Sequence, residues 1–471
     1  TQLSQGDVEY TSFNTNIATV GETDGIVTPV KGTYGTAVII AKSNGYSAIV
    51  RVKTKPADTA DVKSIASPMV AAGGGHTIAL KYDGTVWSWG YNADGELGQG
   101  NTTSVYSPVQ VKSADGSSYL TDIIEIAAGA YHNLALAKDG TVWSWGYNAD
   151  GELGNGTKAK SALPVKVTGL TDAVSIAAGY YQSFAVRKDG SVWSWGYNGY
   201  GSLGLGNSTN RTTAQQVLGG ASGSQYLTDI VEVKAAKQHT LALKANGTVY
   251  AWGYNYCGQL GSNVGSSYTP VQVVTGEQKS ASGYLEKVVD IDDVSSDSTD
   301  NYPNGTSIAL TESKEVYGWG YSYYGQLGKS GTFRSPIKVG NINTAVGVAL
   351  GGTSNGYFTY ILKEDGTVSS LGYNEYGQLG NGTKNNSSAA QDVKNVTDIV
   401  QVSGSQNGYH GAFVKKDGTV WTVGYNENGQ LGNGTADNKS VPIQAGTEGS
   451  NVLVVHEVTL ASSIDDDTPM G

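Results

Sequence analysis

One segment with a fixed arrangement of apolar and polar positions returns along most of the chain. It reads DGTVWSWGYNADGELGQG from Asp83 and recurs, with decreasing fidelity, from Asp139, Asp189, Asn246, Ser313, Asp365 and Asp417. The run VWSWG does not simply alternate apolar and polar residues, which indicates a strand that packs on both faces. Glycine-rich turns follow the run, so the pattern predicts short strands rather than helices.

Each copy has companion strands at regular positions. A pattern such as DIIEIAAGAYHNLALAKDG precedes the copy, and an edge segment such as SPVQV, LPVKV, TPVQV, SPIKV or VPIQ follows it. Four short strands per unit, repeated at 50 to 67 residues, are typical of propeller blades. Seven copies therefore predict an all-β protein built around a seven-bladed β-propeller over residues 58–446.

The repeat resembles a known family. The pattern WGYNxxGxLGxG, preceded by GxxHTLAL, is similar to the regulator of chromosome condensation repeat over about residues 61–446. This resemblance implies a seven-bladed propeller. Members include an exchange factor for a nuclear GTPase that also binds chromatin, secreted bacterial inhibitors of β-lactamase, and bacterial surface proteins. The resemblance therefore leaves the function to be argued from a site.

The first 57 residues have a different pattern. Residues 8–54 read as four or five strands separated by Gly and Asn turns. The stretches SFNTNIATV, GIVTPVKGTYGTA and GYSAIVRVK resemble the bacterial immunoglobulin-like group 2 domain, which implies a bacterial cell-surface protein. The opening strand of that domain, of the type V-x-V-T-L, is missing. An immunoglobulin-like sandwich without it would expose a sheet edge and part of its core.

The tail, residues 447–471, supplies a candidate for the missing strand. Residues 452–460 alternate as a half-buried strand does, and the seven predicted blades leave no place for it. We expect this strand to complete the N-terminal domain of another copy, or of a following module, by strand addition. Pairing with its own chain, and a disordered tail, are the alternatives. The assembly strand would use Val452, Val454, His456, Val458 and Leu460, and the acceptor domain Val8, Tyr10, Ile17, Val20 and Val27.

Composition limits the partners. The net charge of -11 makes a nucleic-acid backbone an unfavourable partner, and no apolar run is long enough to span a membrane. The single cysteine, Cys257, cannot form an internal disulfide and leaves the compartment open. The acidic balance and the near-identical early repeats favour a bacterial protein over a nuclear one.

Candidate sites are few. Four histidines share one repeat position, where the other copies hold Gln182, Thr306 and Phe358, so we expect a structural role. NADGE resembles part of a calcium loop, but its acids are replaced in other copies, which favours a turn. The longest insertion contains an acidic run that favours a solvated loop, with a divalent-cation site as the alternative. The histidines are His76, His132, His239 and His410, and the acids with calcium-binding potential are Asp290, Asp292, Asp293 and Asp297.

No nucleophile with a base, and no acid–base pair, emerges at a defined spacing. We therefore expect a non-enzymatic protein without a cofactor. The favoured interpretation is an extracellular or cell-surface bacterial assembly protein whose copies or modules join head to tail. The alternative is a propeller whose tyrosine-rich face binds a host or competitor protein. A guanine-nucleotide exchange factor is a remote third interpretation.

Overall fold

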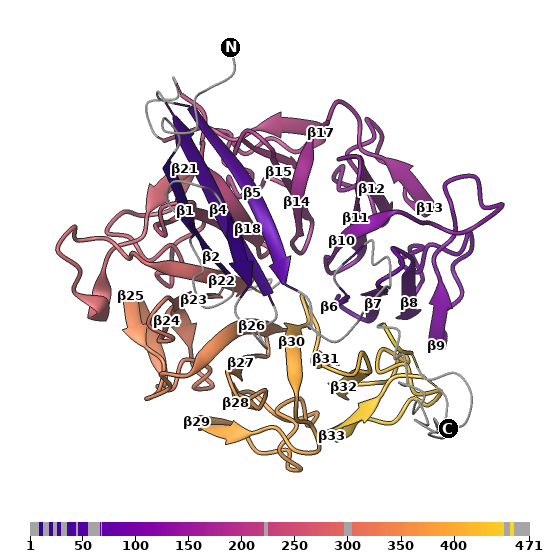
Figure 1. Ribbon diagram of the computed structural model, residues 1–471. Coiled ribbons are helices and arrows are strands. Elements are labelled where there is room, and N and C mark those ends of the chain that lie inside the picture. The colour runs from indigo at the N-terminus through magenta and orange to yellow at the C-terminus, as the bar shows by residue number, and fades with distance from the viewer. Residues whose placement is uncertain are drawn as a thin grey trace, which may run out of the picture.

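The fold is all-β, and its main body is a ring of seven blades (Figure 1). The computed structural model describes residues 9–12, 18–21, 26–29, 35–43, 46–54, 66, 68–220, 225–295, 304–446 and 453–455. Each blade is one antiparallel sheet of four strands that follow one another in the sequence. The predicted seven-bladed propeller is thereby confirmed.

The strands fall into four classes by their distance from the ring axis. The inner strands are β6 (Met69–Ala72), β10 (Ile123–Ala128), β14 (Ala173–Ala178), β18 (Ile230–Ala235), β22 (Val288–Ser295), β26 (Ala345–Thr353) and β30 (Ile399–Gly404). The second strands are β7 (His76–Leu80), β11 (His132–Ala137), β15 (Gln182–Arg187), β19 (His239–Lys244), β23 (Gly305–Thr311), β27 (Gly356–Lys363) and β31 (His410–Lys415). The third strands are β8 (Val86–Gly90), β12 (Val142–Gly146), β16 (Val192–Gly196), β20 (Val249–Gly253), β24 (Val316–Ser322), β28 (Val368–Gly372) and β32 (Val420–Gly424). The outer strands are β9 (Val105–Gln110), β13 (Ser161–Lys166), β17 (Arg211–Gln216), β21 (Ser267–Gln272), β25 (Gly331–Lys338), β29 (Ser387–Asp392) and β33 (Lys439–Gln444).

This order gives the ring two different faces. Because neighbouring strands are antiparallel, the turns from inner to second strands lie on the same face as the loops from third to outer strands. The opposite face carries the second-to-third turns and the linkers from each outer strand to the next blade. We call this opposite face the linker face.

The hydrophobic core lies between the blades. The third strands place one large buried side chain at each of five junctions, where the tryptophan ring packs between two sheets. These side chains are Trp89, Trp145, Trp195, Trp252 and Trp319; Leu371 and Val423 take the place in the last two blades. Burial on both faces explains why VWSWG lacks simple alternation.

The ring closes without a shared sheet, because all four strands of blade 7 come from its own repeat. Gln401 bridges the gap with its carboxamide, which accepts from Val70 N at 2.7 Å and donates to Val70 O at 2.8 Å. Ser403 Oγ accepts from Ala72 N at 3.1 Å.

The tail also takes part in closure, which corrects the expectation that the propeller leaves no place for it. Leu453 and Val455 are buried in the core cluster that joins blades 7 and 1. Val455 N donates to Gly418 O at 2.7 Å, and Val455 O accepts from Tyr82 N at 2.9 Å. Val454 is half-buried and forms a bridge with Thr419. The segment therefore acts as the seventh linker, and the propeller extends to residue 455 rather than 446.

The rest of the proposed assembly strand, Val452 and His456 to Leu460, lies outside the described residues. The predicted assembly strand would bury Val452 and Val454. In the structure the alternate side chains, Leu453 and Val455, are the buried ones. Three residues of the nine-residue strand are thus used within their own chain.

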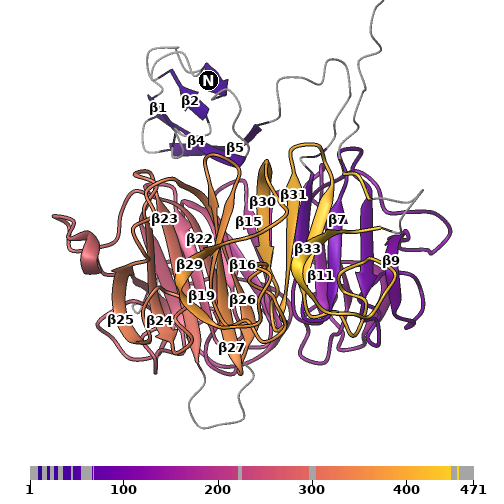
Figure 2. The same cartoon turned by 90° about the horizontal axis from the view of Figure 1, so that it is seen from below.

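The described residues of the N-terminal segment form five strands, within the four or five that its pattern predicts. β1 (Glu9–Ser12), β4 (Gly35–Ser43) and β5 (Tyr46–Thr54) form one sheet in the order β1-β4-β5. β2 (Ala18–Val20) and β3 (Val27–Pro29) form a separate pair in which Val20 lies opposite Val27. Tyr10 lies in β1, whereas Val8 and Ile17 lie outside the described residues. Figure 2 shows these strands beside one face of the ring.

Candidate functional site

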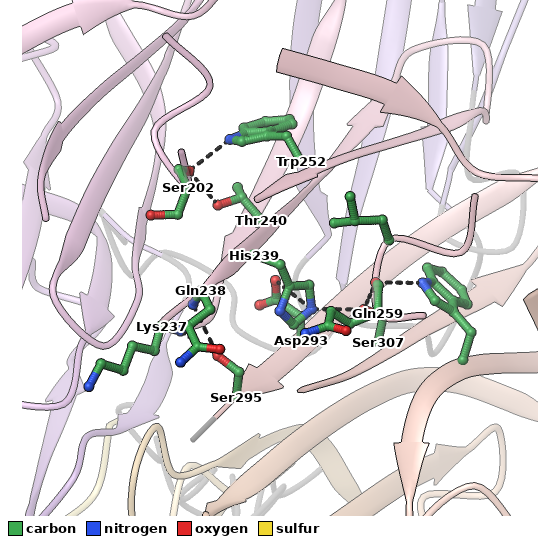
Figure 3. A network of polar contacts seen from close by, with 12 residues as sticks. Ser202, Lys237, Gln238, His239, Thr240, Trp252, Gln259, Asp293, Ser295 and Ser307 are labelled. Carbon is green, nitrogen blue, oxygen red and sulfur yellow. Dashed lines mark hydrogen bonds and ion pairs between the residues drawn. The ribbon is translucent and has the colours of Figure 1, made fainter. Parts of the chain in front are cut away.

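The histidines have a structural role, as expected, and the structure shows that they connect neighbouring blades. In each of the four blades that carry one, Nε2 contacts the residue that follows the equivalent position in the next blade. His239 Nε2 lies 2.9 Å from Ser307 Oγ, and this hydroxyl donates to Gln259 O at 2.8 Å. The hydroxyl therefore accepts from the imidazole, which fixes the proton on Nε2 (Figure 3).

Burial keeps these histidines neutral. It lowers the pKa of His76 to about 4 and the pKa of His132, His239 and His410 to about 3. A neutral imidazole that donates from Nε2 is a structural group at each of these four junctions. This arrangement confirms the structural interpretation over a ligand set.

A backbone carbonyl completes each junction. Ser202 O accepts from Trp252 Nε1 at 2.7 Å and from Thr240 Oγ1 at 2.9 Å, both on the following blade (Figure 3). The same double contact recurs at Gln430 O, Glu96 O, Glu152 O and Gln259 O. Two hydrogen bonds to one buried carbonyl fix the angle between successive blades.

The acidic run lies on an inner strand, not in a solvated loop. Asp290, Asp292 and Asp293 belong to β22, and Asp297 lies outside the described residues. Asp292 Oδ2 accepts from Leu350 N of the next blade at 2.7 Å, and Asp290 Oδ2 accepts from Val348 N at 3.3 Å. The carboxylates thus bridge blades 5 and 6, which explains why a strand can hold them.

Asp292 lines a central cavity of about 230 Å³ between the inner strands, together with Glu125, Glu232 and Lys234. Lys234 Nζ lies 3.4 Å from Glu232 Oε1, and both side chains come from β18. Burial raises the pKa of Asp292 to about 6 and that of Asp293 well above its usual range. Within the described ranges no group of three His, Cys, Asp or Glu side chains is placed to hold a metal ion.

The NADGE loops are held by hydrogen bonds between residues of the same loop, as expected for a turn. Asn92 Oδ1 accepts from Leu97 N at 2.8 Å, and its Nδ2 donates to Thr103 O at 2.9 Å. Glu96 Oε2 accepts from Asp94 N at 2.9 Å. Burial raises the pKa of Glu96 to about 7. These oxygens are committed to the loop rather than to a cation.

The same loops position a ring of tyrosines. Each loop begins with a glycine at positive φ, and at Gly90 (φ 104°) an added Cβ would lie 2.6 Å from Gly75 O. Tyr91 follows, and its backbone N donates to Gly75 O at 2.8 Å. The close backbone contact turns the chain and directs the tyrosine onto the face of the third-to-outer loops, which we call the tyrosine face.

Further tyrosines from the inner-to-second turns join this ring. The tyrosine face carries Tyr91, Tyr131, Tyr147, Tyr180, Tyr181, Tyr197, Tyr200, Tyr254, Tyr256, Tyr321, Tyr323, Tyr324, Tyr357, Tyr373, Tyr376, Tyr409 and Tyr425. Neighbouring rings are in contact, with centroids 4.5 Å apart for Tyr180 and Tyr181 and 4.9 Å apart for Tyr376 and Tyr409. Such contacts hold the rings in place.

The inner-to-second turn of blade 7 crosses the end of the central cavity on this face, which we call the channel mouth. Asn407 Nδ2 donates to Tyr180 OH at 2.9 Å and to Tyr131 OH at 3.2 Å, on blades 3 and 2. Gln406 Nε2 donates to Asp293 O of blade 5 at 3.0 Å. Asn407 adopts φ 63°, a conformation that asparagine tolerates better than most residues. The crossing ties four blades together and makes the centre of the face rigid.

Charge is distributed unevenly over the tyrosine face. Lys237 Nζ lies 4.7 Å from the Tyr180 ring centroid and 5.4 Å from that of Tyr181, and burial lowers its pKa to about 8. On the other side of the ring, Tyr425 OH donates to Glu427 Oε2 at 2.6 Å. Burial raises the pKa of Tyr409 to about 12, so the phenol is neutral. The chemistry of the face is aromatic contact and hydrogen bonding.

Sequence reasoning placed the repeat tyrosines but missed Asn407, Lys237 and Leu453. Asn407 precedes a glycine in the turn SQNGYH, where blades 1 and 2 have AGxxH, and this departure was the available signal. Leu453 falls in the stretch NVLVV, which shares its first two residues and an apolar fifth residue with the linker stretch NVTDI of residues 395–399. The strand-like alternation of HEVTL concealed that match.

Comparison with known proteins agrees with this geometry. The model of the RCC1-like domain matches residues 42–355 and, in an overlapping match, residues 114–463. The chain belongs to the RCC1-like domain family. This RCC1-like chain is 29% identical over 382 residues to the ultraviolet-B receptor UVR8 of Arabidopsis thaliana, covering 79% of the chain and 80% of UVR8. It is 26% identical over 373 residues to human E3 ubiquitin-protein ligase HERC2, a match that spans 79% of the chain but only 6% of the ligase.

Solved structures share the fold. Prp20p of Saccharomyces cerevisiae superposes with a TM-score of 0.62 at 23% identity, covering 78% of this chain and 86% of Prp20p. Human WBSCR16 superposes with a TM-score of 0.61 at 21% identity, covering 77% and 94% of the two chains. At these identities the likeness establishes the RCC1-like propeller and leaves the function to the site.

Proposed function

We propose that this RCC1-like chain is a non-enzymatic protein-binding propeller that captures a partner protein on its tyrosine face. One observation carries the proposal: the tyrosine ring is locked across the channel mouth by Asn407, which contacts Tyr131 and Tyr180 on two other blades. A rigid aromatic surface loses little side-chain entropy on binding, and tyrosine is enriched in protein interfaces.

The exposed tyrosines supply the first contacts. Tyr323 is 66% exposed and Tyr256 is 49% exposed, and both lie on third-to-outer loops of neighbouring blades. Each phenol offers a large apolar ring and a hydroxyl donor. Burial of such a ring in an interface, with its hydroxyl paired, is typical of the residues that dominate binding energy.

Matched tyrosines on the linker face provide the control. Tyr119 is 53% exposed and Tyr226 is 54% exposed, but both lie in linkers between blades. A photo-crosslinking amino acid placed at position 256 or 323 should join the full chain to one protein from the source cells or their medium. The same group at 119 or 226 should not. Equal yields from both faces would contradict the proposal.

The partner found in this way then allows a direct measurement. Tyr256→Ala combined with Tyr323→Ala should weaken its binding at least about tenfold, since truncation of central aromatic residues typically costs more than 1 kcal/mol. Tyr119→Ala combined with Tyr226→Ala should leave the affinity unchanged. Isothermal titration calorimetry distinguishes the two results.

Self-assembly at a bacterial cell surface is a second candidate, favoured by the N-terminal sheet. Among the described residues, the order β1-β4-β5 leaves the outer edges of β1 and β5 without a pairing strand. We propose that this segment is an immunoglobulin-like domain and that the tail from His456 onward completes it in another copy. Fibre formation by the full chain, and its loss in a chain ending at Val455, would support this candidate. Monomers in both cases would exclude it.

A further inference from the structure

The seven outer strands are all sheet edges, and six of them are protected. An open edge pairs readily with another strand, so proteins block edges with proline, short length or covering loops. Proline stands at the same repeat position in five outer strands, where its missing N–H prevents further pairing. These prolines are Pro108, Pro164, Pro270, Pro336 and Pro442, and the two exceptions are Ala214 in β17 and Ala390 in β29.

A second protection comes from the preceding blade. At five junctions a loop glycine donates its N–H to an outer-strand carbonyl, as Gly156 N does to Thr212 O of β17 at 2.9 Å. The other four pairs are Gly434 with Tyr106, Gly100 with Ala162, Gly206 with Tyr268 and Gly382 with Ser440. β17 is therefore covered despite its lack of proline.

β29 lacks both protections. The carbonyl equivalent to Thr212 O is that of Ser388, and among the described residues no loop glycine donates to it. The loop that lies against β29 comes from the preceding blade, blade 5. Its Gly325 packs against Ser388, but the loop then enters a longer hairpin in which Tyr321 pairs with Thr332. Four of the six β29 residues are exposed, including Ala390, and none is buried. The bulge that opposes the third strand recurs in all seven blades, so it does not distinguish β29.

We propose that β29 is an interaction edge that pairs with β29 of a second copy of this chain, antiparallel about a two-fold axis. The strand SSAAQD is self-complementary when centred on Ala390. Ser388 then lies opposite Asp392 of the second copy, where its hydroxyl donates to the carboxylate, and no like charges meet. The small side chains allow the two backbones to approach.

The side chains of β29 itself that lie along this edge are weakly held. Gln391 Nε2 donates to Ala389 O at 3.3 Å and to Ala390 O at 3.4 Å, both long for hydrogen bonds. Asp392 Oδ1 lies 3.4 Å from Lys363 Nζ, with the aspartate side chain 84% exposed. A second strand can replace these contacts at little cost. Pairing would join two four-stranded blades into one sheet and display two tyrosine faces, which raises avidity for a multivalent partner.

Proline substitution tests the edge with the repeat as its own control. Ala390→Pro removes the central N–H at a position where five other blades hold proline, so the fold should be retained. Sedimentation equilibrium of the full chain from about 3 to about 300 μM should show a weak dimer, as expected for a contact below the usual interface size. Ala390→Pro should raise its Kd at least about tenfold, whereas Ala214→Pro should not change it.

A cysteine variant locates the contact. With Cys257→Ser removing the single native thiol, Ala390→Cys should form a disulfide-linked dimer under mild oxidation, because two-fold pairing places the two positions opposite each other. Gln215→Cys, on the exposed side of β17, should stay monomeric. A wild-type monomer over the whole concentration range, or an Ala390→Pro chain that dimerises like the wild type, would overturn the proposal. Neither result bears on the tyrosine face.

Discussion

Removal of the tail segment at residues 453–455 should destabilise the whole propeller, because this segment is the seventh linker. Leu453 is 5% exposed and Val455 is fully buried, in the cluster that joins blades 7 and 1. Leu453→Ala should cost about 2–5 kcal/mol, the range for a buried leucine that leaves a partly relaxed cavity. Val455→Ala should cost about 1.5–3 kcal/mol.

Truncation should have a larger effect than either substitution. A chain ending at Gly446 loses both side chains and the three backbone hydrogen bonds of the segment, each worth about 1 kcal/mol. The sum approaches the whole net stability of a typical domain, about 5–15 kcal/mol. A chain ending at Val455 keeps every one of these contacts and should unfold like the full chain.

Urea titration followed by tryptophan fluorescence measures the difference, because Trp89 belongs to the same cluster as Leu453. Leu120→Ala is the matched control: Leu120 fills the equivalent place between blades 1 and 2, where the chain continues through the junction. It should cost a similar amount. Equal urea midpoints for the chains ending at 446 and at 455 would refute the linker role.

Three further predictions concern the blade junctions. Glu96→Gln should raise the free energy of unfolding at pH 8 by about 1–3 kcal/mol. Burial raises the pKa of the Glu96 carboxyl to about 7 in the folded chain, so unfolding releases a proton between about pH 4.5 and 7 and the ionised carboxylate destabilises the fold above that range. The gain should vanish below about pH 5 in urea titrations at several pH values. In the wild type, His132 has a pKa of about 3 when folded, so below pH 6.5 only the unfolded chain protonates this imidazole and the free energy of unfolding falls. His132→Gln, which copies Gln182, should make this fall with decreasing pH smaller. Thr359→Val should cost more than Thr240→Val by about 1 kcal/mol in the same assay, since its carbonyl acceptor has no tryptophan as second donor.

The repeat predicted the blades correctly because each copy carries its own strands and turns. Local pattern was insufficient wherever a residue depends on a neighbouring blade. Asp290 and Asp292 read as a solvated run, yet backbone N–H groups of blade 6 donate to both carboxylates on an inner strand. Asn407 gained its role only when the closed ring placed blade 7 beside Tyr131 and Tyr180. Such contacts connect different blades and have no signature in one repeat.

The scaffold explains some residues of the repeat loop and leaves the tyrosine unexplained. Gly90 is needed because a side chain would strike the neighbouring turn, and Asn92 is needed because its carboxamide closes the loop. Blade 5 replaces this asparagine with Ser322, whose hydroxyl accepts from Leu327 N and donates to Lys329 O. Tyr321 nevertheless keeps the repeat position between Gly320 and Ser322. The backbone requirement therefore varies while the tyrosine persists in all seven copies, as expected if the ring is retained for contact with a partner rather than for folding.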